Sequence, residues 1–183
     1  MLVEDKRTER FLRHLLVALG FEKRGFRFEP APSGKGAAEA WVLSRYPSEV
    51  KVLRAKPYQR LSVIAVRDGD RAGVTARKAQ LDSALATDGL APRGAGERIA
   101  TPVPTWAIEN WLLELLGHPG VNEDRGPEPG EGTTWKQVFE HDHGATEREA
   151  MREAATAWRE AQGDRSGLPS LNDGHTELAR LDQ

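Results

Sequence analysis

The strongest strand signal in this chain is LSVIAVRDGD, at residues 61–70. Its first six residues form an apolar run rich in β-branched side chains, which is typical of a strand buried on both faces of a sheet. The Asp-Gly-Asp sequence that follows is turn-forming and ends the run. These ten residues therefore predict the central strand of a parallel sheet, with two carboxylates placed directly after it.

Weaker strand signals lie on both sides of this run, at Leu2-Val3, Phe26–Phe28 and Arg98–Val103. Apolar residues at three- and four-residue spacing lie between and after them and predict helices. We expect helices over residues 8–19, 37–53, 74–85 and 105–116, with the second interrupted near Pro47. Thr8 and Thr105 are candidate N-caps. Strands alternating with helices predict an α/β fold with a mostly parallel four-stranded sheet flanked by helices.

The charge changes sign along the chain, which divides it into two regions. Residues 1–117 carry 19 Lys and Arg against 14 Asp and Glu, whereas residues 118–183 carry 7 against 14. Pro and Gly are frequent in residues 119–133, and helical patterns follow over 135–141, 146–161 and 167–181. We expect a catalytic domain at 1–117 and a loop with an acidic helical extension at 118–183, whose Trp135 and Trp158 helices are candidates for an exposed interface.

The composition excludes several classes of protein. With 38% hydrophobic residues and a net charge of −2, the 183-residue chain is not wholly disordered. It has no cysteine, so disulfides, thiolate nucleophiles and Cys-ligated zinc are excluded. Its apolar runs are too short to span a bilayer, and no basic segment precedes an apolar one after Met1, so we expect no membrane association, no signal peptide and a cytoplasmic location.

Acidic residues follow three of the expected strands, at the edge where an open parallel sheet places its functional site. They are Glu4 and Asp5, Asp68 and Asp70, and Glu109, with Glu9 in the first turn of the first helix. Carboxylates that converge repel one another and raise each other's pKa unless a cation lies among them. Because hard oxygen ligands select Mg²⁺ or Mn²⁺, the pattern predicts a site for one of these ions.

Each feature also has a structural explanation, and those explanations remain open. Asp-Gly sequences form ordinary turns, and acidic residues in a first helical turn interact favourably with the helix dipole. The Gly-rich loop SGKG at residues 33–36 is either a phosphate-binding loop or a simple turn. Residues 141–143, His-Asp-His, are a possible metal site, but no ligand from another segment of the chain is evident near them. Trp106 and Trp111 lie among apolar residues, which favours a core role over base stacking.

Three motifs together resemble the topoisomerase–primase (TOPRIM) domain superfamily. They are LVE at residues 2–4, VIAVRDGDRAG at 63–73 and IENWLL at 108–113. The resemblance covers residues 1–117 and is greatest to small stand-alone prokaryotic TOPRIM-like proteins and to OLD-type nucleases. It implies a Rossmann-like sheet with Mg²⁺ or Mn²⁺ as cofactor. The chain departs from the family pattern at Asp5, where Gly is common, and at Glu9, which lies five residues after Glu4 rather than four.

The resemblance also assigns roles to individual carboxylates. Asp68 and Asp70 would bind one ion, and Glu4 would be a ligand or a general base beside it. Glu9 and Glu109 would help to hold a second ion. Two such ions can activate an attacking water and stabilise the leaving oxygen at phosphorus.

Basic residues near these carboxylates are candidate contacts to the phosphates of a nucleic acid. They are Lys6, Arg7, Lys35 and Arg71. The expected function is thus metal-dependent phosphodiester hydrolysis, on DNA in preference to RNA, in phage defence or DNA repair with an ATPase partner. The alternative is a non-catalytic module of the same fold that binds nucleic acid or docks on an ATPase. Phosphoryl or nucleotidyl transfer of the primase kind is a third possibility, without an identified nucleotide-binding surface.

Overall fold

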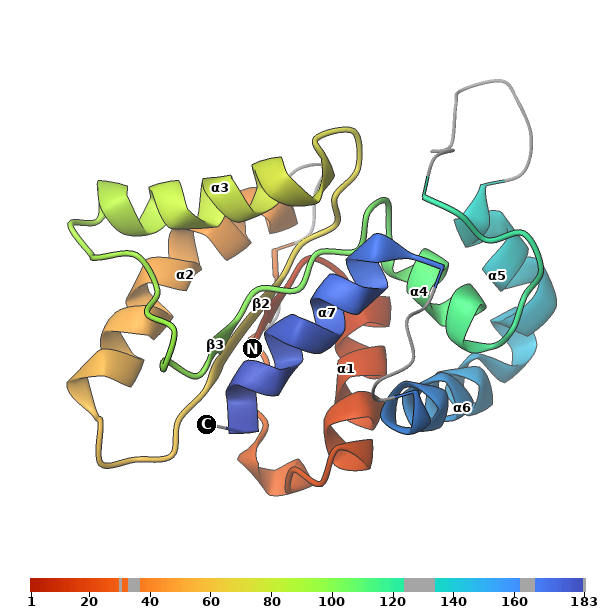
Figure 1. Ribbon diagram of the computed structural model, residues 1–183, viewed down its shortest axis with the longest axis horizontal. Coiled ribbons are helices and arrows are strands. Elements are labelled where there is room, and N and C mark those ends of the chain that lie inside the picture. The colour runs from red at the N-terminus through yellow and green to blue at the C-terminus, as the bar shows by residue number, and fades with distance from the viewer. Residues whose placement is uncertain (30, 33–36, 124–133, 162–166, 183) are drawn as a thin grey trace.

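The computed structural model describes residues 1–29, 31–32, 37–123, 134–161 and 167–182 (Figure 1). Its elements in chain order are β1 (Leu2–Val3), α1 (Lys6–Ala18), η1 (Lys23–Gly25), α2 (Ala37–Ala55), β2 (Val63–Val66), α3 (Gly73–Thr87), β3 (Ile99–Ala100), α4 (Ile108–Leu115), α5 (Trp135–His143), η2 (Gly144–Thr146), α6 (Glu147–Glu160), α7 (Pro169–Ala179) and η3 (Arg180–Asp182). The α/β class expected from the sequence is confirmed. None of the described helices has the length and apolar character needed to cross a membrane.

The sheet has three strands in the described part of the chain, in the order β1-β2-β3, and both pairs are parallel. Leu2 pairs with Ala65 and Val63 pairs with Ile99, so β2 is central, as its apolar sequence predicts. One of the four expected strands, at Phe26–Phe28, is not a strand in the structure. Residues 26–28 do not pair with a neighbouring strand. The Met1 amino group, next to β1, donates a hydrogen bond to Arg27 O at 2.7 Å.

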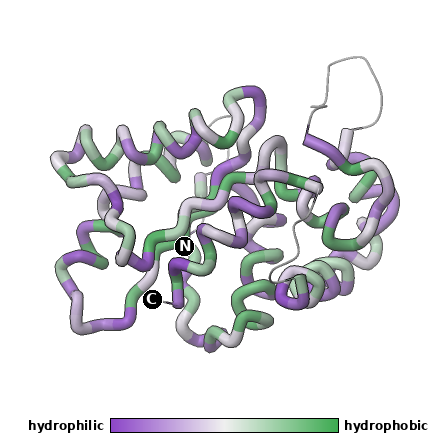
Figure 2. The backbone as a smooth tube through the Cα atoms, viewed as in Figure 1, coloured by the Kyte–Doolittle hydropathy of each residue, from purple (hydrophilic) through white to green (hydrophobic). Residues whose placement is uncertain are grey.

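Alternation along the strands gives the sheet two apolar faces, each covered by helices (Figures 1 and 2). One face carries Leu2, Val63, Ala65 and Ile99 and packs against α2 and α3. The other carries Val3, Ile64, Val66 and Ala100 and packs against α1, α4, α6 and α7. Burial on both faces explains why β2 is continuously apolar.

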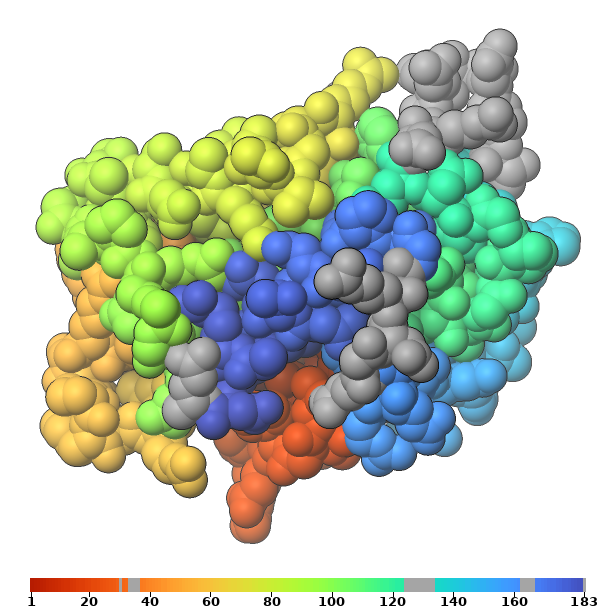
Figure 3. Space-filling view, in the orientation of Figure 1, coloured from red at the N-terminus to blue at the C-terminus, as the bar shows by residue number. Residues whose placement is uncertain are grey.

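The region after residue 118 contributes to the same core as the sheet. Trp158 of α6 is 1% exposed and lies against Trp111 of α4, with ring centroids 5.4 Å apart. Trp158 is therefore a core residue, and an interface on its helix would have to use other side chains of α6. Leu171 and Leu178 of α7 are buried in this core as well. In the space-filling view α7 lies across the front of the molecule, between α3 and α1 (Figure 3).

The caps of α1 and α4 and the continuity of α2 differ from the sequence expectation. Asp5, rather than Thr8, caps α1: its carboxylate accepts hydrogen bonds from the backbone N–H groups of Arg7 and Thr8. Helix α2 continues through Pro47 without interruption. Helix α4 begins after Ala107 rather than after Thr105. Asp is as good an N-cap as Thr, so the residue types alone did not decide between Asp5 and Thr8 as the cap of α1.

Replacing Gly174 with alanine is expected to destabilise the protein by about 2 kcal/mol, within the range of overpacked cores. A Cβ atom at this position in α7 would lie 2.5 Å from Trp111 Cη2 and 3.0 Å from Trp158 Cη2. The higher helix propensity of alanine, about 1 kcal/mol, opposes this effect but does not offset it. Urea unfolding of the variant measures the difference, and a midpoint at or above the wild-type value would contradict this packing.

Glu177 joins α7 to the rest of the fold. Its carboxylate accepts hydrogen bonds from Lys78 Nζ at 2.9 Å, from Arg93 Nη2 at 2.8 Å and from the Thr101 backbone N–H at 2.9 Å. Burial alone would raise the pKa of Glu177, but these donors outweigh it and lower the pKa to about 2. The ionised carboxylate therefore stabilises the folded state at neutral pH.

The substitution Glu177→Gln is expected to lower stability by about 3 kcal/mol at pH 7. A lowered pKa in the folded state adds stability that is complete above the ordinary value of 4.5 and is lost as the pH falls towards 2. The free energy of unfolding of the variant should therefore approach that of the wild type between pH 5 and pH 2. Glu160→Gln, on the exposed surface of α6, is the control, and a wild-type pH slope in Glu177→Gln would refute this role.

Candidate functional site at the carboxyl edge of the sheet

The carboxyl edge of the sheet brings three loops together. The loop after β2 is bound to the loop after β3 by two backbone hydrogen bonds, from Gly69 N to Pro104 O at 2.7 Å and from Asp70 N to Trp106 O at 3.3 Å. Glu4, which follows β1 next to β2, lies at the same edge. Parallel strands end together, so the acidic residues that follow them are neighbours here.

Asp68 lies at the centre of this edge. Its carboxyl group is partly buried, and its pKa is raised well above the ordinary value, first by burial and then by the negative charges of Asp5, Glu4, Glu109 and Asp70. The side chain makes no hydrogen bond or ion pair with any residue that the structure describes. The negative charges of four other candidate carboxylates therefore act on Asp68, which has no cationic partner among the described residues.

Glu4 is held by an arginine inside the protein. Arg67 Nε donates a hydrogen bond to Glu4 Oε1 at 3.0 Å, and the Arg67 side chain is 0% exposed. Burial raises the pKa of Glu4, and the Arg67 guanidinium opposes that rise. Strand alternation directs Arg67 to the α2–α3 side of the sheet and Asp68 to the opposite side. This explains why Glu4 has a cationic partner and Asp68 has none.

Asp70 is in the left-handed backbone region, with φ of 44°, which is uncommon for a residue other than glycine. Its side chain is 60% exposed and accepts a hydrogen bond from Arg77 Nη2 at 3.1 Å. The tight turn keeps Asp70 next to Asp68 at the start of α3. Asp70 is therefore the most accessible carboxylate of the Asp68-Gly69-Asp70 turn.

Glu109 forms an ion pair with Arg7 at 2.5 Å, and both side chains are largely buried. Arg7 also contacts Glu140 at 2.6 Å and Glu147 at 3.2 Å, and its guanidinium lies 5.2 Å from the centre of the Phe139 ring. Burial alone would lower the pKa of Arg7, but the hydrogen bonds to these carboxylates raise it. Arg7, a candidate phosphate contact, is thus held among three carboxylates.

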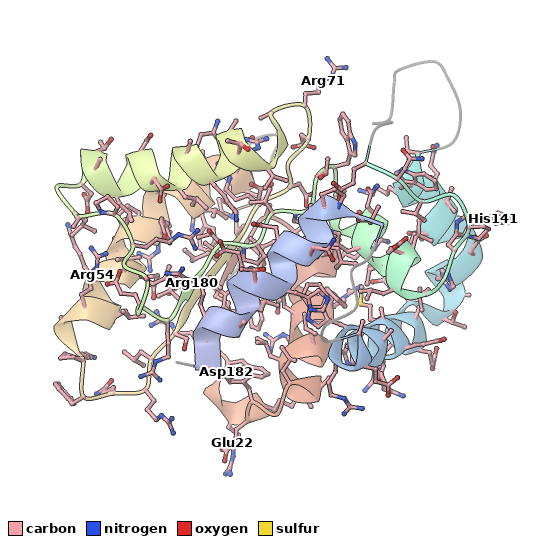
Figure 4. All side chains as sticks on the ribbon, viewed as in Figure 1. Glu22, Arg54, Arg71, His141, Arg180 and Asp182 are labelled. Atoms are coloured by element: carbon pink, nitrogen blue, oxygen red, sulfur yellow. The ribbon has the colours of Figure 1, made fainter. Side chains whose placement is uncertain are left out.

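The remaining candidate residues lie in other arrangements. Asp5 caps α1, and Glu9 pairs with Arg13 one turn further along α1, at 2.7 Å. Lys6 and Arg71 are exposed, and Arg71 points away from the molecule (Figure 4). Lys35 lies outside the described residues, together with the rest of the 33–36 loop.

The other aromatic and histidine candidates have identifiable contacts. Trp111 is buried, and the indole N–H of Trp106 donates a hydrogen bond to Glu123 O at 3.0 Å. Asp142 contacts His141 Nδ1 at 2.7 Å and His118 Nε2 at 3.5 Å. The described residues contain no group of three or more His, Asp or Glu side chains arranged to hold a metal ion. At the sheet edge, this agrees with the pairing of Glu4, Asp70 and Glu109 with arginines.

Sequence reasoning did not identify the side chains that organise this edge. Arg67 and Arg77 are buried, and both donate hydrogen bonds to Glu39 Oε1 in the first turn of α2 and to Gln80 Oε1 in α3. A signal for Arg67 was present, because an arginine that continues the alternation of a fully buried strand requires anionic partners. No sequence signal identified Glu39 as that partner.

Comparison with known proteins finds no relative for this chain. No family model, no curated protein and no solved structure matches it. The geometry of the carboxyl edge and the motif resemblance to TOPRIM domains are therefore the two grounds for assigning a function.

Proposed function

We propose that this chain is a Mg²⁺- or Mn²⁺-dependent nuclease of the TOPRIM kind, with its site at the carboxyl edge of the sheet. The observation that carries the proposal is the carboxyl group of Asp68, which has no cationic partner among the described residues and whose pKa is raised by burial and by the negative charges of four other acidic side chains. A divalent cation would relieve this repulsion and is the ligand that hard carboxylate oxygens prefer.

The donor set fits such an ion at Asp68 and Asp70. Asp68 offers a carboxylate without a competing partner, and Asp70 is 60% exposed and bonded to Arg77 through Oδ2, which leaves its Oδ1 for a metal ion. When bound, the ion would supply Lewis-acid activation of water and of the phosphodiester. The present pairing of Glu4 and Glu109 with arginines favours one ion at this edge over two.

The protein's own residues have separate roles in this proposal. Asp68 and Asp70 would bind the ion, and Glu4, whose pKa is raised by burial, would accept a proton from the attacking water. The exposed Lys6 and Arg71 contact phosphates of the substrate, which we take to be DNA.

Cleavage of plasmid and single-stranded DNA with Mg²⁺ or Mn²⁺ tests this function. The wild type should cut only when a divalent ion is present, and the double variant Asp68→Asn, Asp70→Asn should not cut. Asp82→Asn, in an exposed position of α3, is the matched control and should retain wild-type activity. A wild type that neither cuts nor binds a divalent ion would refute the proposal.

One observation favours a second candidate, a non-catalytic module that binds nucleic acid or docks on an ATPase. Glu4, Asp70 and Glu109 each already have a guanidinium partner, which neutralises them without a metal ion. Binding of DNA that weakens steeply with salt and occurs without turnover would support this candidate.

A further inference from the structure

A cluster of two buried arginines, a glutamate that is 40% exposed and an exposed glutamine lies at the carboxyl edge, on the α2–α3 side of the sheet. Arg67 Nη2 donates a hydrogen bond to Glu39 Oε1 at 2.6 Å, and Arg77 Nη1 donates to the same oxygen. Gln80 Oε1 accepts from Arg67 Nη1 at 2.6 Å and from Arg77 Nη1 at 3.2 Å. Two guanidinium groups therefore share two acceptors, one of which is charged.

Each arginine of the cluster also holds one carboxylate at the edge. Arg67 binds Glu4 at 3.0 Å through Nε, and Arg77 binds Asp70 at 3.1 Å through Nη2. The planar guanidinium group can contact Glu39 and an edge carboxylate at once, which the single ammonium of a lysine does not reproduce. The cluster therefore connects α2 to two carboxylates of the carboxyl edge, Glu4 and Asp70.

Glu39 is the residue on which this arrangement depends. Because both arginines donate to one of its oxygen atoms, their guanidinium groups lie close together and would repel each other without its negative charge. The positive charges of both arginines lower the pKa of Glu39, so it is ionised at neutral pH. Without that charge, at least one arginine would move and release Glu4 or Asp70.

We propose that Glu39 is a positioning residue of the site, acting through Arg67 and Arg77 to hold Glu4 and Asp70 at the carboxyl edge. This inference rests on the proposed function, because the positions of Glu4 and Asp70 matter for catalysis only if the edge is a reaction centre. The inference adds to that function a residue of α2, on the α2–α3 side of the sheet, that holds the site carboxylates through two arginines. Glu39 itself does not touch the substrate.

The test compares Glu39→Gln with Glu49→Gln. Glu49 is also in α2 and also pairs with an arginine, Arg45 at 3.4 Å, but it lines a cavity at the opposite, amino-terminal edge of the sheet. We expect Glu39→Gln to lower kcat by about 10–100-fold, with KM within about threefold of the wild type, as for other residues that orient functional groups. Glu49→Gln should retain the wild-type kcat, and thermal unfolding of both variants shows whether they are folded.

Hydrogen exchange of the Arg67 Nε–H group, followed by nitrogen-15 NMR, gives a second measurement that needs no activity. This proton is buried and bound to Glu4, so its exchange is slow, and Glu39→Gln should accelerate it by about tenfold or more. Glu49→Gln should leave it unchanged.

These two measurements separate the inference from the proposed function. If the wild type neither cuts DNA nor binds a divalent ion, the proposed function fails. Whenever the wild type does not cut DNA, the exchange rate alone decides whether Glu39 holds Glu4 through Arg67. Faster exchange in Glu39→Gln then supports this role, and unchanged exchange overturns it. If the wild type cuts DNA and Glu39→Gln cuts equally fast, the positioning role is overturned whatever the exchange rate.

Discussion

Replacement of Gly69 with alanine is expected to destabilise the protein by about 3 kcal/mol and to disrupt the carboxyl edge of the sheet. A Cβ atom at Gly69 would lie 2.1 Å from Thr105 O and 2.8 Å from Pro104 O. Both contacts are with backbone atoms, so no side chain can move aside to relieve them. The two loops would have to separate, and the hydrogen bond from Gly69 N to Pro104 O would be lost.

Chemical denaturation and the cleavage assay together measure this effect. The matched control is Gly96→Ala, in the loop before β3, because a Cβ atom there would have no neighbour within 4 Å. We expect a large loss of stability and of cleavage for Gly69→Ala and wild-type behaviour for Gly96→Ala. Equal unfolding midpoints for the two variants would show that the loops are not in the close contact described.

The substitution Asp68→Asn is expected to abolish metal-dependent cleavage, with a loss of at least about 10²–10³-fold, while making the metal-free protein more stable. The loss of activity follows from removal of the charged ligand. The gain in stability follows from the raised pKa of Asp68: when the pKa of a carboxyl group is higher in the folded state, its ionised form destabilises that state. A residue retained at a cost in stability is typical of a functional site.

The pH dependence identifies the source of that gain. At a pH below the ordinary value of 3.8, Asp68 is protonated in both the folded and the unfolded state, so the variant and the wild type should have equal stability. The difference should grow as the pH rises through the raised pKa of the folded state. Mn²⁺ should raise the thermal unfolding midpoint of the wild type, because an ion that binds only the folded protein stabilises it. Thermal unfolding with and without Mn²⁺ measures this rise. A less stable Asp68→Asn at pH 7 without metal would contradict this account.

The parts of the fold that could be predicted are those encoded by local patterns. The run at residues 61–66 gave the central strand because burial on both faces requires continuous apolar residues, and the period of α1 was equally clear. Phe26–Phe28 also alternates, but three residues are too few to distinguish a paired strand from an extended loop. Trp158 lies in a highly charged helix, and its burial depends on long-range packing against Trp111.

The candidate site was predictable only as far as the topology of parallel strands determines it. Because parallel strands end at one edge, the acidic residues that follow them were predicted to lie near Asp68. The pKa of Asp68 is raised by burial and by the negative charges of four of these residues. The charges that neutralise these residues come from elsewhere in the sequence. Arg67 precedes Asp68 by one residue yet reaches Glu39, and Arg7 reaches Glu147, 140 positions along the chain. Such pairs have no fixed spacing, so no pattern in a single sequence predicts them.

Mn²⁺ binding to the wild type and to Asp68→Asn, measured by isothermal titration calorimetry at pH 7.5, shows whether Asp68 is the centre of a metal site. We expect the wild type to bind one ion per chain, because Asp68 has no cationic partner among the described residues and a divalent ion would relieve the repulsion from the acidic residues around it. Asp68→Asn should bind at least about 10²-fold more weakly. If both proteins bind Mn²⁺ equally, or if neither binds it, Asp68 is not the centre of a metal site.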